Sequence, residues 1–176
     1  MKLQKLTPND FDVYYSLRLE SLQQCPVMYA TDANDWQAVP REVIEKHLLL
    51  SQSEQAPLFG AWQAGVLVGL LGLNPDSRPT VRHKGTLWGF YVAPAARRQG
   101  IGRALLEHAV LVAKSKLRLE QLRVVVTLHD PAAVRLFEQF GFREYGREPR
   151  AKLLDGVYYD QAYFWYPLAD AQKGGE

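Results

Sequence analysis

The sequence has little cysteine, no long apolar run and almost no imbalance of charge. A single cysteine, Cys25, among 176 residues excludes an internal disulfide. No stretch approaches the roughly 20 apolar residues of a membrane-spanning helix, and the opening residues lack the apolar segment of a secretory signal. We therefore expect a protein of the reducing cytoplasm that has no membrane partner.

The charges nearly cancel, since 21 Lys and Arg face 19 Asp and Glu for a net charge of +2. A nucleic-acid-binding domain normally has a basic excess, so no nucleic acid partner is expected. The densest basic cluster is Arg97, Arg98 and Arg103. For its charge alone, a solvated helix end is the alternative to a binding site.

Hydrophobic periodicity predicts a mixture of strands and helices, without repeats or low-complexity segments. Strands are predicted over residues 2–8, 56–63, 65–74, 85–94, 122–128, 141–148 and 157–168. Helices are predicted from residues 8, 41, 101 and 130, and residues 28–40 are predicted as a loop. With 47% hydrophobic residues, the chain suits one α+β domain, 1–170, followed by a disordered tail, 171–176.

The segment VAPAARRQGIGRALL, residues 92–106, begins a helix without a polar N-cap. A Ser, Thr or Asp usually accepts a hydrogen bond from one of the free amides, but Gln99, Gly100, Ile101 and Gly102 stand there. Glycine inside a helix costs about 1 kcal/mol relative to alanine. An anion can satisfy these amides, because the helix dipole favours negative charge and glycine lets a phosphate approach the backbone. The alternative is a tight turn that binds nothing.

Two common phosphate motifs do not fit, whereas a third pattern does. A dinucleotide fingerprint needs glycine where Leu105 stands, and the P-loop sequence G-K-[ST] is absent. The segment instead resembles the acetyl-coenzyme A motif of the GCN5-related N-acetyltransferases, [RQ]-x-x-G-x-[GA], here Arg97, Gly100 and Gly102. The later DPAAVRLFEQFGF, residues 130–142, is similar to that family's second signature.

The resemblance implies a GNAT-like fold in a single N-acetyltransferase domain. Its central sheet would be mixed and mostly antiparallel, with about six to seven strands, splayed in the middle and flanked by about four helices. The implied activity transfers acetyl from acetyl-coenzyme A, as co-substrate and without metal, to a primary amine of a small molecule or peptide. The protein would be a monomer or homodimer. A catalytically silent acyl-coenzyme A sensor and a protein-interaction domain remain alternatives.

The same resemblance assigns coenzyme contacts. Amides of residues 99–104 would bind the pyrophosphate, strand residues 90–92 would pair by backbone with the pantetheine arm, and the second signature would lie along its other side. For Asp130 the alternative is a plain helix N-cap. The implied coenzyme residues are Phe90, Tyr91, Val92, Arg97, Arg98, Gln99, Gly100, Ile101, Gly102, Arg103, Ala104, Asp130, Ala133 and Phe137.

The usual acid and base of the family are absent. Thr86 and Val125 stand where relatives keep a glutamate, and Phe137 stands where they keep a tyrosine. Catalysis is still expected, because proximity alone supplies about 7 to 11 kcal/mol and a thiol of pKa about 8.5 leaves readily. The remaining catalytic candidates are His129, Tyr158 and Tyr159, with His83 as a weaker one. For each, a place without a catalytic role is the alternative.

By the same resemblance, the first helices and the last hairpin wall the acceptor site. Aromatic rings and carboxylates suit a cationic amine. The predicted acceptor residues are Tyr14, Arg18, Glu20, Tyr29, Trp36 and Asp160. For Tyr14 and Trp36 the alternative is core packing.

Overall fold

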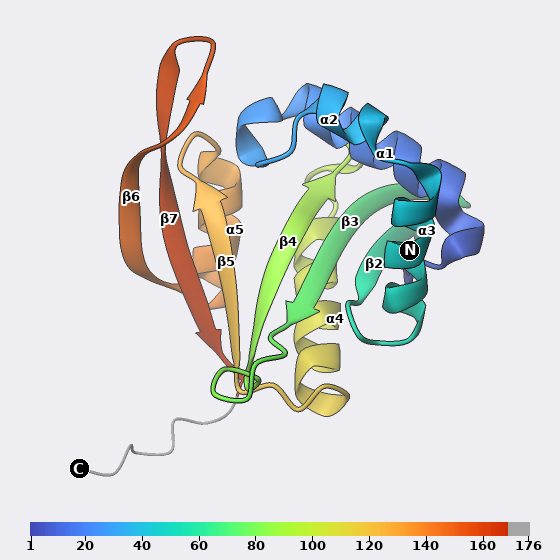
Figure 1. Ribbon diagram of the computed structural model, residues 1–176. Helices are drawn as coiled ribbons and strands as arrows, with labels where there is room; N and C mark the ends of the chain where they lie inside the picture. Colours follow the sequence, from blue (N-terminus) through green and yellow to red (C-terminus); the bar gives the residue numbers. More distant parts are fainter. Residues whose placement is uncertain (169–176) are drawn as a thin grey trace.

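In the computed structural model, which describes residues 1–168, seven strands form one sheet with helices on both faces (Figure 1). The strands are β1 (Lys2–Lys5), β2 (Leu58–Gln63), β3 (Val66–Pro75), β4 (Lys84–Val92), β5 (Gln121–Thr127), β6 (Arg143–Leu154) and β7 (Val157–Pro167). Their order is β1-β2-β3-β4-β5-β7-β6, and each neighbouring pair is antiparallel except β4 with β5. The α+β prediction and the strand number are confirmed. The predicted tail, 171–176, lies outside the described residues.

Residues 1–168 contain five α-helices, one more than expected. They are α1 (Phe11–Gln24), α2 (Ala33–Ala38), α3 (Arg41–Gln52), α4 (Ile101–Ser115) and α5 (Pro131–Phe140). The extra helix, α2, and a 3-10 turn at Pro26–Met28 overlap the predicted loop. Asp32 caps α2 by accepting a hydrogen bond from the amide of Asp35 at 2.7 Å. That loop prediction was therefore wrong, because a polar capped helix has no long apolar stripe to reveal it.

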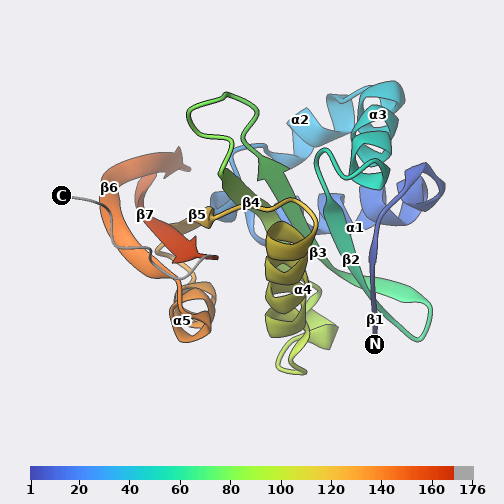
Figure 2. The same ribbon diagram turned by 90° about the horizontal axis from the view of Figure 1, so that it is seen from below.

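Helices lie on both faces of the sheet (Figure 2), and a hydrophobic core lies between the helices and each face. On one face, α4 buries Ile101, Leu105 and Ala109, the helical stripe that the sequence predicts. On the other face, α1 and α3 pack Tyr14 and Leu48 against β2 and β3. Each buried leucine contributes about 1.5 to 3 kcal/mol. No helix within the described residues combines the length and apolarity that crossing a bilayer requires.

The β2–β3 hairpin turns where the sequence predicts, whereas the β6–β7 hairpin is longer than predicted. Ala64 and Gly65 link β2 to β3, both with positive φ, as a two-residue type I′ turn needs. The predicted linker 152–156 is shorter than expected, since β6 continues to Leu154 after an irregularity between Glu148 and Lys152. This irregularity turns the outer part of the hairpin away from a regular ladder.

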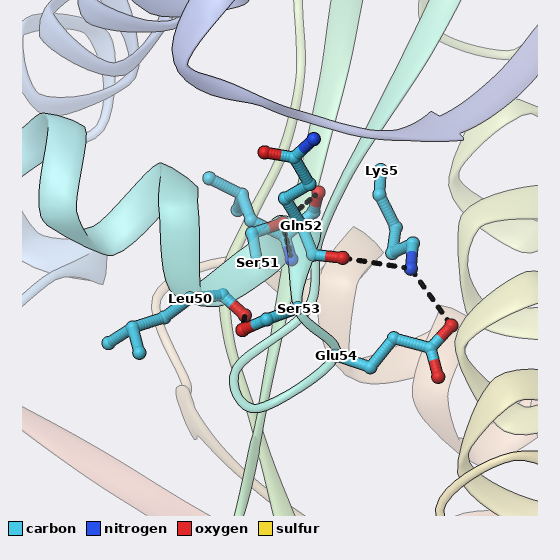
Figure 3. A network of polar contacts seen from close by, with 7 residues as sticks. Lys5, Leu50, Ser51, Gln52, Ser53 and Glu54 are labelled. Atoms are coloured by element: carbon cyan, nitrogen blue, oxygen red, sulfur yellow. Dashed lines mark hydrogen bonds and ion pairs between the residues drawn. The ribbon is translucent and has the colours of Figure 1, made fainter.

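Polar contacts tie the end of α3 to the sheet (Figure 3). Lys5 of β1 donates from Nζ to Glu54 Oε1 at 2.9 Å and to the carbonyl of Gln52 at 3.4 Å. The buried Ser51 hydroxyl accepts a hydrogen bond from the amide of Leu58 at 2.9 Å. The end of α3 is thus fixed to β1 and β2, at the edge of the sheet opposite to β6.

The parallel pair β4–β5 separates after a short common start. Pairing is confined to residues 84–86 with 121–123. Farther along, β4 contains one extra residue relative to β3, and Gly89 adopts φ +63°, a conformation that favours glycine. The two strands diverge toward their carboxyl ends (Figure 1), so the expected splay is confirmed. Among residues 1–168, the Phe90–Val92 edge has no strand partner on the β5 side.

Candidate active site

A cleft of about 480 Å³ lies where β4 ends and α4 and α5 begin. It collects most of the predicted coenzyme residues: Phe90, Tyr91, Val92, Arg97, Arg98, Gly100, Ile101, Gly102, Arg103, Asp130 and Ala133. The sequence analysis missed further lining residues, namely Cys25, Met28, Ala96, Ala132 and Leu136, whose apolar or neutral side chains give no chemical signal. Of the predicted acceptor residues, Tyr29 joins them.

The start of α4 has no side-chain cap, as the sequence indicates. Gly100 occupies the N-cap with φ +79° and offers no side chain to the free amides. Arg98 also adopts a positive φ, +62°. The amide of Ala104 donates to the carbonyl of Gly100 at 3.0 Å, so it is engaged in the helix. The amides before it have no acceptor inside the helix, which leaves residues 101–103 available to an anion.

Neighbouring side chains leave no room for a side chain at Gly102. A Cβ at this position would lie 2.9 Å from Phe90 Cζ and 3.1 Å from Leu136 Cδ2. Gly100, in contrast, has open space where its Cβ would be. Phosphate approach is thus not the sole reason for the second glycine, because it also allows α4 to lie against the Phe90 ring.

The three predicted arginines differ in their contacts. Arg97 donates from Nε to the carbonyl of Val92 at 2.9 Å, and Arg103 pairs with Glu107 at 2.9 Å. Arg98 is exposed and takes part in no ion pair within residues 1–168. Gln99 lies outside the cleft lining, where its Nε2 donates to the carbonyl of Ala95 and its Oε1 accepts from Nε2 of Gln63.

Both residues singled out in the second signature have structural partners. Asp130 Oδ1 accepts from the amides of Ala132 and Ala133 at 2.9 and 3.1 Å, which is the N-cap alternative, although the residue also lines the cleft. Phe137 is 2% exposed and packs edge-on against Phe90, with ring centroids 5.6 Å apart. It belongs to the core and supports the cleft from behind.

A short segment, Val27–Tyr29, bridges the splayed strands. The carbonyl of Val27 accepts from Thr127 Oγ1 of β5 at 3.2 Å and from Lys152 Nζ of β6 at 2.9 Å. Tyr29 donates its hydroxyl to the carbonyl of Phe90 of β4 at 2.9 Å. Burial lowers the pKa of Lys152 to about 8. The sequence analysis missed Thr127 and Lys152, because their role depends on contacts 100 and 125 residues away along the chain.

The predicted acceptor residues divide into core and site. Tyr14 is 2% exposed, its pKa is raised to about 12 by burial, and its ring meets Trp36 edge-on at 5.7 Å. Both pack as the core alternative expects. Glu20 accepts from the hydroxyl of Tyr91 at 2.8 Å, beside the cleft. Asp160 lies on the far hairpin, where its carboxylate accepts from the amide of Arg150 at 2.8 Å.

The predicted catalytic residues lie outside the cleft lining. His129 and Tyr159 pack edge-on, with ring centroids 5.1 Å apart. Tyr158 is 48% exposed and lies beneath the Arg150 guanidinium, 3.8 Å from ring centroid to Cζ. His83 lies just before β4, at the opposite end from the cleft, and its carbonyl accepts from the amide of Glu120.

Residues 18–142 match the model of the acetyltransferase (GNAT) family. The chain is 34% identical over 70 residues to YwnH of Bacillus subtilis, covering 40% of this chain and 42% of that protein. It is 24% identical over 99 residues to the L-amino acid N-acetyltransferase AaaT of Escherichia coli, covering 56% and 60%. The alignments thus span about half the length of these curated relatives.

Two solved structures share the whole fold. The GNAT-family acetyltransferase from Streptococcus pneumoniae superposes with a TM-score of 0.85 at 22% identity, covering 96% of this chain and 99% of that one. The yncA protein from Salmonella typhimurium, solved with its cofactor acetyl-CoA, gives 0.82 at 18% identity, covering 99% and 98%. At these identities the likeness concerns the fold.

Proposed function

The chain belongs to the acetyltransferase (GNAT) family, and on this premise we propose that it transfers an acetyl group from acetyl-coenzyme A to a primary amine of a small molecule or peptide. The observation that carries the proposal is one cleft that joins an uncapped helix start to an unpaired strand edge. The first suits a diphosphate and the second suits an amide-bearing arm. The acetyl-CoA-bound yncA structure, of the same fold, supports this co-substrate.

The diphosphate would contact the amides of residues 101–103, with Arg97, Arg98 and Arg103 around it. Charge-assisted hydrogen bonds from these groups favour a phosphate over a neutral ligand. Of the predicted amide contacts, Ala104 is the weaker one, because its amide already donates to the carbonyl of Gly100, and Gln99 lies outside the cleft lining.

The pantetheine arm would pair with β4 through Phe90 and Val92. The amide of Ala93 donates to the carbonyl of Val68 on β3. Backbone N–H and C=O groups alternate in direction along a strand, so those of Phe90 and Val92 face the open side. Their carbonyls accept from Tyr29 and Arg97, but each carbonyl oxygen has a second lone pair and each amide remains to donate. The strand edge can therefore receive the arm while both side chains stay bonded.

The transfer requires the amine nitrogen to attack the thioester carbonyl, after which the carbon–sulfur bond breaks. The amine must lose a proton, and the coenzyme sulfur leaves as thiolate or thiol. We propose that positioning supplies most of the rate, because the one carboxylate in the cleft lining of residues 1–168, Asp130, is engaged as a helix cap. His129 and Tyr159 remain the proposed proton-transfer candidates, and the exposed Tyr158, which lies under Arg150, is the weaker one.

Two measurements test the proposal. Calorimetry should detect acetyl-coenzyme A binding, and absence of binding would contradict it. A thiol-release assay over a panel of primary amines should then detect turnover. Binding without release for any amine would support a silent acyl-coenzyme A sensor instead.

If Tyr159 donates a proton, Tyr159→Phe should lower turnover by about 100-fold or more at unchanged coenzyme affinity, with Tyr158→Phe as the matched control.

A further inference from the structure

Arg18 of α1 is a buried cation without an acidic partner. Its side chain belongs to a residue that is 7% exposed. Within residues 1–168, none of the ion pairs includes Arg18. Its one hydrogen bond to a side chain there is a long one, 3.4 Å from Nη1 to Ser21 Oγ. A guanidinium has five N–H donors, so most of its hydrogen-bonding capacity is unused.

The surroundings of Arg18 place it next to the proposed transfer site. Its Cζ lies 4.3 Å from the centroid of the Tyr29 ring, and Tyr29 bonds the carbonyl of Phe90 on the open edge of β4. A Cβ on Gly89 would lie 3.9 Å from Arg18 Nη1, so the guanidinium is beside the bulge that starts the splay. At that distance a Cβ would be in ordinary van der Waals contact, so the positive φ of position 89 is what favours glycine there.

The nearest acidic candidate on the same helix is occupied. Glu20 holds the hydroxyl of Tyr91 at 2.8 Å and makes no ion pair with Arg18. Burial lowers the pKa of Arg18, which expresses the unfavourable removal of its charge from water. A buried charge is normally offset by an opposite charge with good hydrogen-bond geometry. An anionic ligand would provide that offset here.

The coenzyme is not the suitable anion. Its phosphates would lie among Arg97, Arg98 and Arg103 at the start of α4, whereas Arg18 lies on α1, which covers the opposite face of the sheet (Figure 2). An anion that reaches Arg18 therefore belongs to the molecule that approaches from the α1 side.

We propose that Arg18 binds a carboxylate of the acceptor, so that the acceptor is an amino-acid-like molecule carrying both a primary amine and a carboxylate. This inference rests on the proposed function. Arginine suits the task because its planar fork can bind both oxygens of a carboxylate. The guanidinium carbon lies over the Tyr29 ring, and this cation–π contact restricts the positions that the fork can take.

Matched acceptors test the proposal in the unmodified protein. Several L-amino acids and their carboxamides, which retain the amine but lack the negative charge, are compared by thiol release. We expect kcat/KM to be at least about tenfold higher for the acids, the usual size of a charged hydrogen bond. Equal or better turnover of the amides would overturn the inference while leaving the proposed function intact. Absence of turnover for every amine would instead overturn the proposed function and this inference with it.

Variants identify the residue. Arg18→Gln should raise KM for the acids by about 30-fold or more and change the amides less than threefold, and Arg18→Lys should restore part of the difference. Arg41→Gln is the control, because Arg41 also lies over an aromatic ring, Phe11 at 3.9 Å, but on the surface. An equal loss for acids and amides would show a structural role and overturn the inference. If Arg18→Gln does not fold, competition by N-acetylated amino acids against their amides in the unmodified protein decides the same question.

Discussion

The two sides of the candidate active site are made from different kinds of atoms. The coenzyme side consists mainly of backbone groups within residues 90–103, at the end of β4 and the start of α4. On the proposed acceptor side, side chains from α1, β5 and β6 meet around Val27–Tyr29. A site made of backbone groups needs glycines at fixed spacing, which are visible in the sequence as a short motif. A site made of side chains depends on packing between residues far apart in the sequence. On the proposed function, the first kind of site would hold the coenzyme and the second would select the acceptor.

The strongest way to break the coenzyme side is to fill the space at Gly102. In Gly102→Val the new side chain would press on Phe90 and Leu136, which leave only 2.9 and 3.1 Å for a Cβ. We expect the Phe90 edge to shift and the Kd for acetyl-coenzyme A to rise by at least about 30-fold, or 2 kcal/mol. Overpacking should also lower the free energy of unfolding by about 1 to 3 kcal/mol. Calorimetry and chemical denaturation measure the two effects.

Gly146 provides the control for that substitution. It lies on β6 with nothing within 4 Å of its Cβ position. Gly146→Val should therefore bind the coenzyme with the affinity of the unmodified protein. Normal binding by Gly102→Val, or equal losses in both variants, would contradict the placement of the coenzyme against α4 and β4.

Substitution of Phe137, the ring behind the cleft, is expected to have the next largest effect. Phe137→Tyr restores the hydroxyl that relatives carry, and on the sequence alone it should leave the fold intact. The structure changes that expectation, because Phe137 is 2% exposed and its ring lies among Phe90 and Phe142. Burying a hydroxyl without a partner should lower the free energy of unfolding by about 1 to 3 kcal/mol. Turnover should still change less than tenfold.

The decisive observation for Phe137→Tyr is the combination of stability and turnover. Thermal or chemical denaturation gives the first, and the thiol-release assay gives the second. Unchanged stability together with a rise in turnover of 100-fold or more would mean that the new hydroxyl reaches the leaving sulfur, and the core placement of this ring would be wrong. Tyr14→Phe is a useful reverse control, since it removes a hydroxyl from a core ring on the other face.

Most of the residues predicted to bind the coenzyme line one cleft, whereas the residues predicted to bind the acceptor are dispersed, and the difference has a physical reason. Gly100 at positive φ and the uncapped start of α4 follow from local residue chemistry, which a short segment reveals. The position of Lys152 depends on a strand that runs six residues past its predicted end and on a contact with Val27. Likewise, Tyr14 and Trp36 have the chemistry of a binding site but pack as core, because periodicity does not say which buried rings face a ligand. Tertiary contacts determine the position of Lys152 and the packing of Tyr14 and Trp36, and a local sequence pattern does not contain them.

A smaller effect is expected from charge at the mouth of the cleft. Arg98 is exposed and adopts φ +62°, so Arg98→Asn removes the charge with a residue that tolerates this backbone. We expect the Kd for acetyl-coenzyme A to rise by about fivefold at low salt and by less at high salt, because an exposed pair is screened. Arg78→Asn, on the exposed β3–β4 loop, is the control and should change nothing. Equal effects of both variants would indicate a general charge effect and no local phosphate contact.

The smallest effect concerns pH and the acceptor side. Burial lowers the pKa of Lys152 from its ordinary 10.5 to about 8. Between these values the unfolded chain keeps the proton that the folded chain has lost, so the free energy of unfolding rises with pH across this window. Below pH 8 both states are protonated and the unfavourable burial of the charge is fully present. Lys152→Met should abolish this contribution, which solvent screening of a partly exposed side chain reduces to about 1 kcal/mol.

The measurement is the difference in unfolding free energy between the unmodified protein and Lys152→Met at pH 7 and at pH 10. The difference isolates Lys152, because the other titrating groups are common to both proteins. The carbonyl of Val27 keeps Thr127 as a donor in the variant, so it is not left unpaired. The unmodified protein should gain stability relative to the variant at the higher pH, and Lys114→Met, on the exposed side of α4, should show no such gain. A constant difference would mean that Lys152 stays protonated in the fold, and that the acceptor side admits more water than its contacts indicate.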